Sequence, residues 1–167
     1  MKIGLLSDTH SILKTGIVTF LKGSDEIWHA GDFGSIDVFY KLNKLAPVIR
    51  SVYGNIDGRT FHEDIPENQI FTIEKIKVLI THIGGYPGRY QARVRKLIIE
   101  EKPQLYIAGH SHILKIIHDK KYNVLHINPG AAGKSGFHKI STAIRFEING
   151  DKIENLQIYE LAKGLDT

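Results

Sequence analysis

Five short polar clusters follow apolar runs of this chain, and their side chains could bind metal ions. Together the clusters hold seven oxygen and nitrogen ligands: Asp8, His10, Asp32, Asn55, His82, His110 and His112. The chain has no cysteine, so this set favours hard or borderline divalent cations over a structural zinc finger. Seven ligands are too many for one ion that must also hold water or substrate, but they suit two ions sharing a carboxylate. The residues therefore predict a binuclear hydrolase.

Two such ions could hydrolyse a phosphoester without a nucleophilic side chain. Held about 3.5–4 Å apart, they would lower the pKa of a shared water, so that a metal-bridging hydroxide could attack phosphorus in line. They would also neutralise charge on the non-bridging oxygens, which is most of what phosphoryl transfer requires. The mixed carboxylate, amide and imidazole donors favour Mn²⁺, and iron, nickel or zinc would fit nearly as well.

Each cluster on its own has an ordinary structural explanation. Asp8 could cap a following helix, Asp32 behind a glycine could form a turn, and a lone His82 is more often structural. His110 and His112 are the sharpest local signal, because alternate histidines in an extended segment can diverge toward two ions. What favours a site is that every cluster lies at the carboxyl end of an expected strand.

The first three clusters must be positioned by a parallel sheet. Residues 3–7, 26–30 and 48–53 are short apolar runs, typical of strands buried on both faces. Residues 12–22 and 35–45 between them are compatible with helices. Three strands joined by two helical crossovers form a parallel sheet, and sites in such sheets lie at the carboxyl ends of the strands.

The second half is expected to add a second sheet. Strands over 69–74 and 76–81 precede a helix over 89–101 and a buried strand over 104–108. The last four expected strands are antiparallel: 113–117, 122–127, 140–148 and 152–161. No linker separates the halves, so we expect residues 1–167 to form one α/β domain with two packed sheets and outer helices.

Composition restricts the class of protein. The net charge of +4 is dispersed over 167 residues, which weakly favours anionic ligands and provides no dedicated nucleic-acid-binding region. The lack of cysteine suits a reducing cytoplasm, and no segment approaches the roughly 20 apolar residues that span a bilayer. We therefore expect a cytoplasmic protein that acts away from membranes. Exposed strand edges could support a homodimer.

The order of the clusters resembles a known family. Asp-x-His, Gly-Asp, Gly-Asn-x-Asp, His and Gly-His-x-His follow one another as in the calcineurin-like metallophosphoesterases, over residues 3–133. The compact length is similar to the small YfcE-type phosphodiesterase branch. The resemblance implies a four-layer αββα sandwich of two mixed β-sheets flanked by helices. It also implies a metal-dependent hydrolase of small phosphodiesters, nucleotide-derived ones among the candidates.

The same resemblance implies a role for each ligand. One metal would be held by Asp8, His10 and His112, the other by Asn55, His82 and His110, with Asp32 as the bridge. Asp32, Asn55 and His82 would also be the catalytic residues.

One position departs from the family pattern. Many members have a histidine where this chain has Ile56, and that histidine can donate a proton to the leaving oxygen. Ile56 cannot, so protonation would fall to a metal, to water or to another residue. His62 is a candidate only by its proximity in sequence, with a surface histidine as the alternative reading. Asp57 is retained, with a supporting or structural role expected.

Other signals are interpreted as structural. Residues 128–135 nearly spell a phosphate-binding P-loop, but Asn128 replaces the first glycine and the segment leads toward a strand. In the resembled family an Asn-Pro-Gly turn at this place shapes the rim of the site. His29 and His126 lie within apolar strands and are expected to support the core or the site.

Two alternatives to a small-molecule enzyme remain. A non-catalytic protein-interaction scaffold with a phosphoesterase fold, similar to the retromer subunit Vps29, would be expected to have lost ligands, whereas here all seven are present. A nuclease similar to the Mre11 group would need a much longer chain with added DNA-binding parts. The complete ligand set favours the enzyme.

Overall fold

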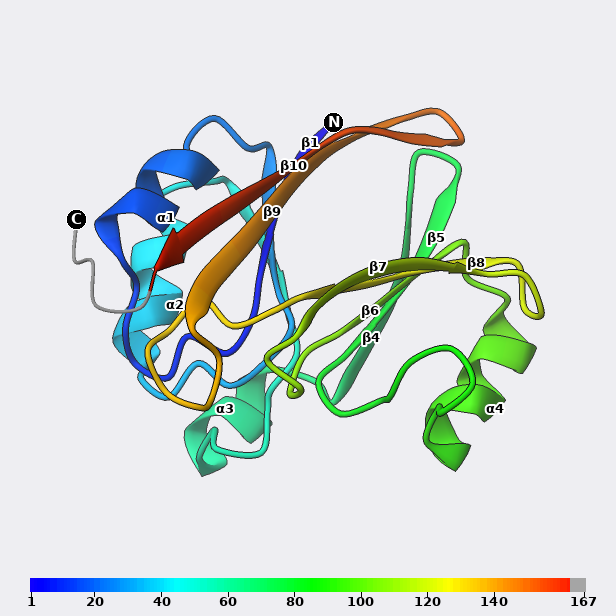
Figure 1. The fold of residues 1–167 in the computed structure, drawn as a ribbon, viewed down its shortest axis with the longest axis horizontal. Helices are drawn as coiled ribbons and strands as arrows, with labels where there is room; N and C mark the ends of the chain where they lie inside the picture. The colour runs from blue at the N-terminus through cyan, green and yellow to red at the C-terminus, as the bar shows by residue number, and fades with distance from the viewer. Residues whose placement is uncertain (163–167) are drawn as a thin grey trace.

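Residues 1–162 are described by a computed structural model, in which two five-stranded β-sheets pack together between outer helices (Figure 1). In chain order the elements are β1 (Lys2–Leu6), α1 (Thr15–Leu21), β2 (Glu26–His29), α2 (Ile36–Asn43), β3 (Val48–Ser51), α3 (Arg59–Asp64), β4 (Asn68–Ile73), β5 (Ile76–Thr81), α4 (Ala92–Glu101), β6 (Leu105–Ala108), β7 (Leu114–Asp119), β8 (Val124–Pro129), β9 (Ile140–Asn149) and β10 (Lys152–Ala162). No helix in this described part is long and apolar enough to cross a membrane.

The first sheet has the strand order β10-β9-β1-β2-β3. As predicted, β1, β2 and β3 are parallel and are connected through α1 and α2. The long β9–β10 hairpin, at the top in Figure 1, completes the sheet because β9 pairs antiparallel with β1. The chain thus returns from its far end to the strand that carries the first polar cluster.

The second sheet has the order β4-β5-β6-β8-β7. Strands β5, β6 and β8 are parallel to one another, and the two edge strands run antiparallel to their neighbours. The expectation that residues 122–127 belong to a purely antiparallel set is therefore wrong with respect to β6. A hydrophobic pattern shows that a strand is buried, but it contains no information on strand direction.

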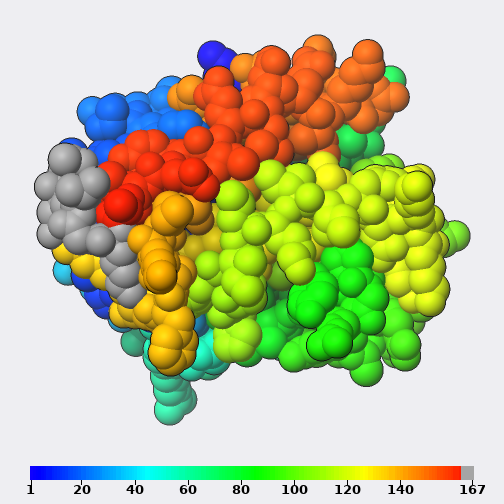
Figure 2. Space-filling view, viewed as in Figure 1, coloured from blue at the N-terminus to red at the C-terminus, as the bar shows by residue number. Residues whose placement is uncertain are grey.

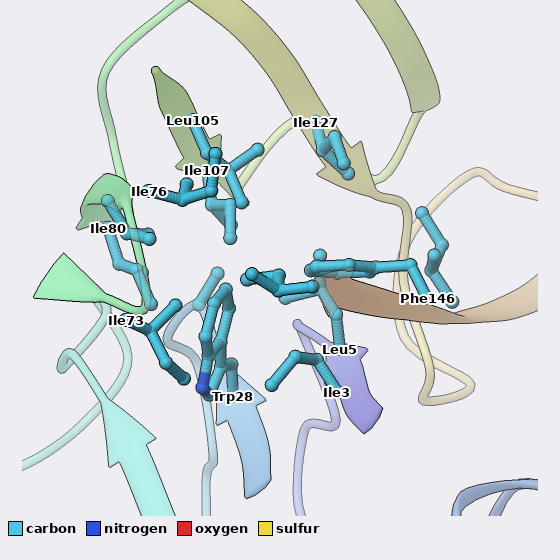
Figure 3. Close-up of a cluster of buried hydrophobic side chains, with 14 of the residues drawn as sticks. Ile3, Leu5, Trp28, Ile73, Ile76, Ile80, Leu105, Ile107, Ile127 and Phe146 are labelled. Carbon is cyan, nitrogen blue, oxygen red and sulfur yellow. The ribbon is translucent and has the colours of Figure 1, made fainter. Parts of the chain in front are cut away.

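Three apolar layers hold the four structural layers together. The central one lies between the sheets and surrounds the fully buried Trp28 (Figure 3). The Trp28 ring meets those of Phe71 and Phe146 edge to face. A second cluster, which includes Ile17 and Leu42, lies between the first sheet and the helices of that side. A third joins the second sheet to α4. This arrangement is the predicted αββα sandwich.

Helix α1 begins at Thr15 rather than at residue 12, and two further differences concern α4 and α3. Helix α4 begins at Ala92 rather than 89, because Gly88 has a φ of +86° and the Arg89 N–H donates to the Tyr86 carbonyl in a turn. The short helix α3 forms where the sequence shows mainly turn residues, with Gly58 at its N-cap. Both differences lie in loops beside the strand ends, where tertiary contacts outweigh local propensity.

Candidate metal centre

The five polar clusters meet where strand ends of both sheets come together. Asp8 and His10 follow β1, Asp32 follows β2 and Asn55 follows β3, while His82 follows β5, and His110 and His112 follow β6. Backbone hydrogen bonds tie neighbouring loops, as from the Asp8 N–H to the Gly31 carbonyl (2.9 Å) and from Gly109 to His82 (3.0 Å). The loops that carry the clusters are therefore fixed by the ends of the ladders.

One group of potential ligands consists of Asp8, His10 and His112. The Nε2 atoms of the two histidines lie 3.3 Å apart, and His112 Nε2 is 3.2 Å from Asp8 Oδ1. Two ligands that each lie about 2.1 Å from a shared ion, at tetrahedral or octahedral angles, would be separated by about 3.0–3.4 Å. Asp8 Oδ1 is buried and accepts no hydrogen bond within the described part of the chain. The three atoms are thus placed as one cation requires.

A second group consists of Asp8, Asp32 and His82. His82 Nε2 lies 3.2 Å from Asp32 Oδ1, 4.0 Å from Asp8 Oδ1 and 3.2 Å from the amide oxygen of Asn55. His82 Nδ1 is 2.7 Å from the Ala30 carbonyl oxygen, so it must carry the proton that it donates there. In the neutral ring the Nε2 lone pair then faces three oxygens. That geometry requires a proton or a metal ion between them.

Asp8 belongs to both groups, and Asp32, a member of the second group, also faces His10 of the first. Its Oδ1 faces His82 and accepts a hydrogen bond from the Ile56 N–H (3.1 Å), whereas its Oδ2 lies 3.7 Å from His10 Nε2. One carboxylate thus offers an oxygen to each group, as a bridge would. His110 stands beside the groups, with its ring 5.3 Å from that of His82 and its backbone N–H donating to Asp8 Oδ2 (3.1 Å).

The electrostatics favour an ionised carboxylate at Asp32. Burial by itself would raise the pKa of Asp32, but the hydrogen bond and charge of His82, the Ile56 amide and His10 outweigh burial and hold the pKa below its usual range. Burial opposes the charged form of His82 as well, yet contact with Asp32 and the charge of Asp8 raise its pKa. Two buried carboxylates therefore attract positive charge into the cluster.

The backbone is strained at most of the candidate ligands. Positive φ angles occur at Asp8 (54°), His10 (45°), Asp32 (60°), His110 (67°) and His112 (58°). Such conformations cost free energy for residues other than glycine, and they persist where the surrounding structure enforces them, often at functional sites. A Cβ atom at Gly54 would overlap the Asp32 carboxylate, which explains the glycine before Asn55.

Several buried groups hold these loops in place. His29 accepts from the Gly31 N–H through Nδ1 (3.2 Å), and its Nε2 lies 3.1 Å from the Thr9 hydroxyl. Burial lowers the pKa of His29 to about 3, so the ring is neutral. Asp57 accepts from the Gly54 N–H (2.8 Å) and also from Gly34 in the neighbouring loop (2.9 Å). Both residues hold the backbone of the loops that carry the candidate ligands.

The Asn-Pro-Gly turn shapes the histidine pair. Asn128 donates to the Gly109 carbonyl (2.8 Å) and the Ser111 hydroxyl (3.0 Å), and it accepts from the Gly130 N–H (2.9 Å). These bonds fix the turn between His110 and His112. His138 was missed by the sequence reasoning: its Nδ1 lies 3.3 Å from His112 Nδ1, but no spacing in the sequence connects the two residues.

His62 is the candidate that the structure does not bring to the cluster. It is exposed on α3, where its ring stacks on Tyr53 with 3.9 Å between centroids. Ile56, in contrast, is at the site, where its backbone amide rather than its side chain contacts Asp32.

The sequence matches a family described as the calcineurin-like phosphoesterase superfamily domain over residues 1–151. A protein called a probable metallophosphoesterase, from Methanothermobacter thermautotrophicus, is 31% identical over 159 residues, which cover 92% of this chain and 90% of the relative. A protein named as a phosphodiesterase, from Methanocaldococcus jannaschii, is 32% identical over 145 residues, covering 78% and 83%.

Solved structures share the fold. A structure described as a novel archaeal phosphodiesterase has a TM-score of 0.75 and 24% identity, and the match covers 96% of this chain and 100% of the other. Vps29 from Entamoeba histolytica, solved in complex with zinc, has a TM-score of 0.77 and 15% identity, with 98% and 100% covered. At such identities the likeness concerns the fold alone.

Proposed function

Because the chain belongs to the calcineurin-like phosphoesterase superfamily, we propose that it is a binuclear metal-dependent phosphodiesterase acting on small phosphodiesters. The observation that carries this proposal is the convergence on His82 Nε2, where three oxygens face a nitrogen whose lone pair has no protein donor in the described part. Asp8 Oδ1, one of these oxygens, is buried and accepts no hydrogen bond from any described residue, and a cation at this place would satisfy it. The relative named as a phosphodiesterase supports the choice of a diester.

The proposed ligands are the seven residues at the strand ends. Asp8, His10 and His112 would hold one ion. Asn55, His82 and His110 would hold the other, and Asp32 would bridge them. Bound there, the ions would supply Lewis acidity and activate a water for attack on phosphorus. The donor set favours Mn²⁺, with iron, nickel or zinc as alternatives.

The protein itself contributes orientation. The Ala30 carbonyl fixes the His82 ring, and the Ile56 amide together with His82 keeps the Asp32 carboxylate ionised and aimed. These contacts hold the ligand atoms before substrate arrives, so little reorganisation is needed during the reaction. Ile56 has no acidic proton, and His62 contacts Tyr53 instead, so we propose that the leaving oxygen takes its proton from solvent at the open edge of the site.

A scaffold function is the second candidate, because Vps29 structures share the fold. A scaffold has no need for strained backbone at five ligand positions or for buried carboxylates facing imidazoles. These features favour the enzyme.

The test combines metal analysis with turnover. Protein purified without chelator should contain close to two transition-metal ions per chain and should hydrolyse an activated aryl phosphodiester. Chelator-treated protein is the control, and added Mn²⁺ should restore its activity. Two results would rule out the enzyme and leave the scaffold. One is that the protein binds no metal, and the other is that it binds two ions but cleaves neither a diester nor a monoester.

A further inference from the structure

A pocket of about 400 Å³ opens beside the candidate metal centre. It shares His110 and Ser111 with the ligand turn after β6, and it extends along residues 83–91 and the start of β7. In Figure 2 the green surface of the 83–91 segment adjoins the yellow-green surface around β7 on the face in view. A phosphodiester whose phosphorus lay at the centre could place one of its organic groups in this pocket.

The charged groups that line the pocket are cationic. Arg89 and Lys115 line its walls, and none of its described lining residues is acidic. The Lys115 ammonium lies 3.8 Å from the centre of the Tyr86 ring, an aromatic contact that holds this half-buried cation at the pocket. Such a pair of cations attracts negative charge beside the candidate metal centre.

The wall that carries Tyr86 and Arg89 is built as a rigid loop. The Tyr106 hydroxyl donates to the Gly85 carbonyl (3.2 Å), the Gln91 N–H to Gly84 (3.0 Å), and the Arg89 N–H to Tyr86 (2.8 Å). The cations are therefore presented on a folded surface rather than on a loose segment.

The pocket is also lined by a buried histidine whose ring has a nitrogen without a hydrogen-bond partner among the described residues. His126 is 1% exposed, its ring stacks on Tyr106, and its Nδ1 has no hydrogen-bond partner in the described part of the chain. Burial lowers the pKa of His126 to about 4, so it stays neutral beside Lys115. An unsatisfied buried nitrogen is costly unless a ligand or water completes it. A water or a polar ligand beside the ring would complete this nitrogen.

We propose that this pocket binds the organic group of the diester, and that Arg89 and Lys115 select substrates in which that group bears an additional phosphate. The inference rests on the proposed phosphodiesterase function and narrows it to one substrate class, phosphodiesters with a second anionic centre. His126 would take part as a neutral hydrogen-bonding group, while the scissile phosphate stays with the metal ligands.

A matched pair of substrates tests the proposal. The metal-loaded protein is assayed with a p-nitrophenyl nucleotide diester and with the same ester bearing an additional phosphate on its sugar. We expect the extra phosphate to lower KM by about tenfold, the size of one charge-assisted hydrogen bond. Lys115→Ala and Arg89→Ala should each raise KM for the phosphorylated ester more than KM for the plain ester, and so remove most of that preference. Lys120→Ala, which removes an exposed cation just after β7, is the control and should keep it.

The outcomes separate this inference from the proposed function. Equal KM values for the two esters in the unchanged protein, or a preference that survives Lys115→Ala, would overturn the pocket assignment and leave the phosphodiesterase intact. If neither ester is hydrolysed, the proposed function fails, and calorimetric binding of the same two esters decides the pocket. Tighter binding of the phosphorylated ester that depends on Lys115 supports the pocket, and equal binding refutes it.

Discussion

The two sheets contribute different chemistry to the candidate metal centre. The first sheet supplies the candidate oxygen ligands, which are Asp8, Asp32 and Asn55, together with one imidazole, His10. The second supplies only imidazoles: His82, His110 and His112. The candidate ligands of the two sheets face one another, so a cation between them would be contacted from both sides only when the sheets are packed together. The site therefore depends on how the sheets pack, and the apolar layer between them is part of the functional design.

The largest effect should come from the carboxylate between the two groups. Asp32→Asn keeps the size of the side chain but removes the charge that faces both His82 and His10. We expect kcat/KM for an activated aryl diester to fall by about a thousandfold, the scale of losing a key electrostatic group. Asp37→Asn, at an exposed position on α2, should be neutral. Near-normal activity of the Asp32 variant would contradict the bridging role.

The packing between the sheets is tested by Trp28, which is fully buried in that layer. Trp28→Ala should destabilise the fold by about 3–5 kcal/mol, because it leaves a large cavity between the halves. Urea unfolding measures this loss, with Tyr40→Ala on the exposed face of α2 as control. If the alanine variant does not fold, Trp28→Phe should show a smaller loss together with weaker metal retention. A normal metal content at reduced stability would show that the ligand loops hold their geometry without this packing.

Each sheet contains a buried histidine with a lowered pKa, His29 in the first and His126 in the second. The contribution of each one can be measured from the pH dependence of stability. The pKa is lowered to about 3 for His29 and to about 4 for His126, mainly by burial. Below the ordinary histidine pKa of about 6.5 these histidines become protonated in the unfolded chain, whereas in the folded protein they stay neutral. Proton binding therefore favours the unfolded state, and each ring destabilises the fold as the pH falls. Between about pH 6 and pH 5, His29→Asn and His126→Asn should each flatten the fall in stability by up to about 1.4 kcal/mol per pH unit.

Chelator-treated protein is the sample for this measurement, because acid also releases metals. His118→Asn, at an exposed position on β7, should leave the slope unchanged. An unchanged slope in the His29 variant would mean that this ring titrates normally in the folded protein.

The smallest effect is expected at Ile56, on the oxygen side of the centre. Ile56→His should leave cleavage of an activated aryl ester unchanged, because a good leaving group needs no proton. Cleavage of an alkyl ester should rise by no more than about tenfold, less than the roughly hundredfold of a well-placed general acid. Ile56→Asn controls for polarity at this place, and equal rates for both variants would exclude proton donation by the new histidine.

The elements that carry the ligands could be predicted because their signals are local. Apolar runs ending at Asp8, Asp32 and His82 identify buried strands, and parallel strands gather their carboxyl ends at one edge. The contacts around these elements could not be predicted in this way. His138 contacts His112 from a loop 26 residues further along the chain. The Lys115 ammonium on β7 lies over the ring of Tyr86, which belongs to the loop after β5. Nothing in the spacing of those residues distinguishes them from surface side chains.

The sequence by itself determined which candidate metal-ligating side chains this protein contains and in what order they follow the strands. Side-chain chemistry and strand burial are properties of short segments, so they can be read along the chain. Only the tertiary structure decided that Asp32 offers one oxygen to His82 and the other to His10, and that cations gather in the pocket beside His110. Those facts depend on the packing of two sheets and on loops held at positive φ, which are set by contacts between residues far apart in sequence.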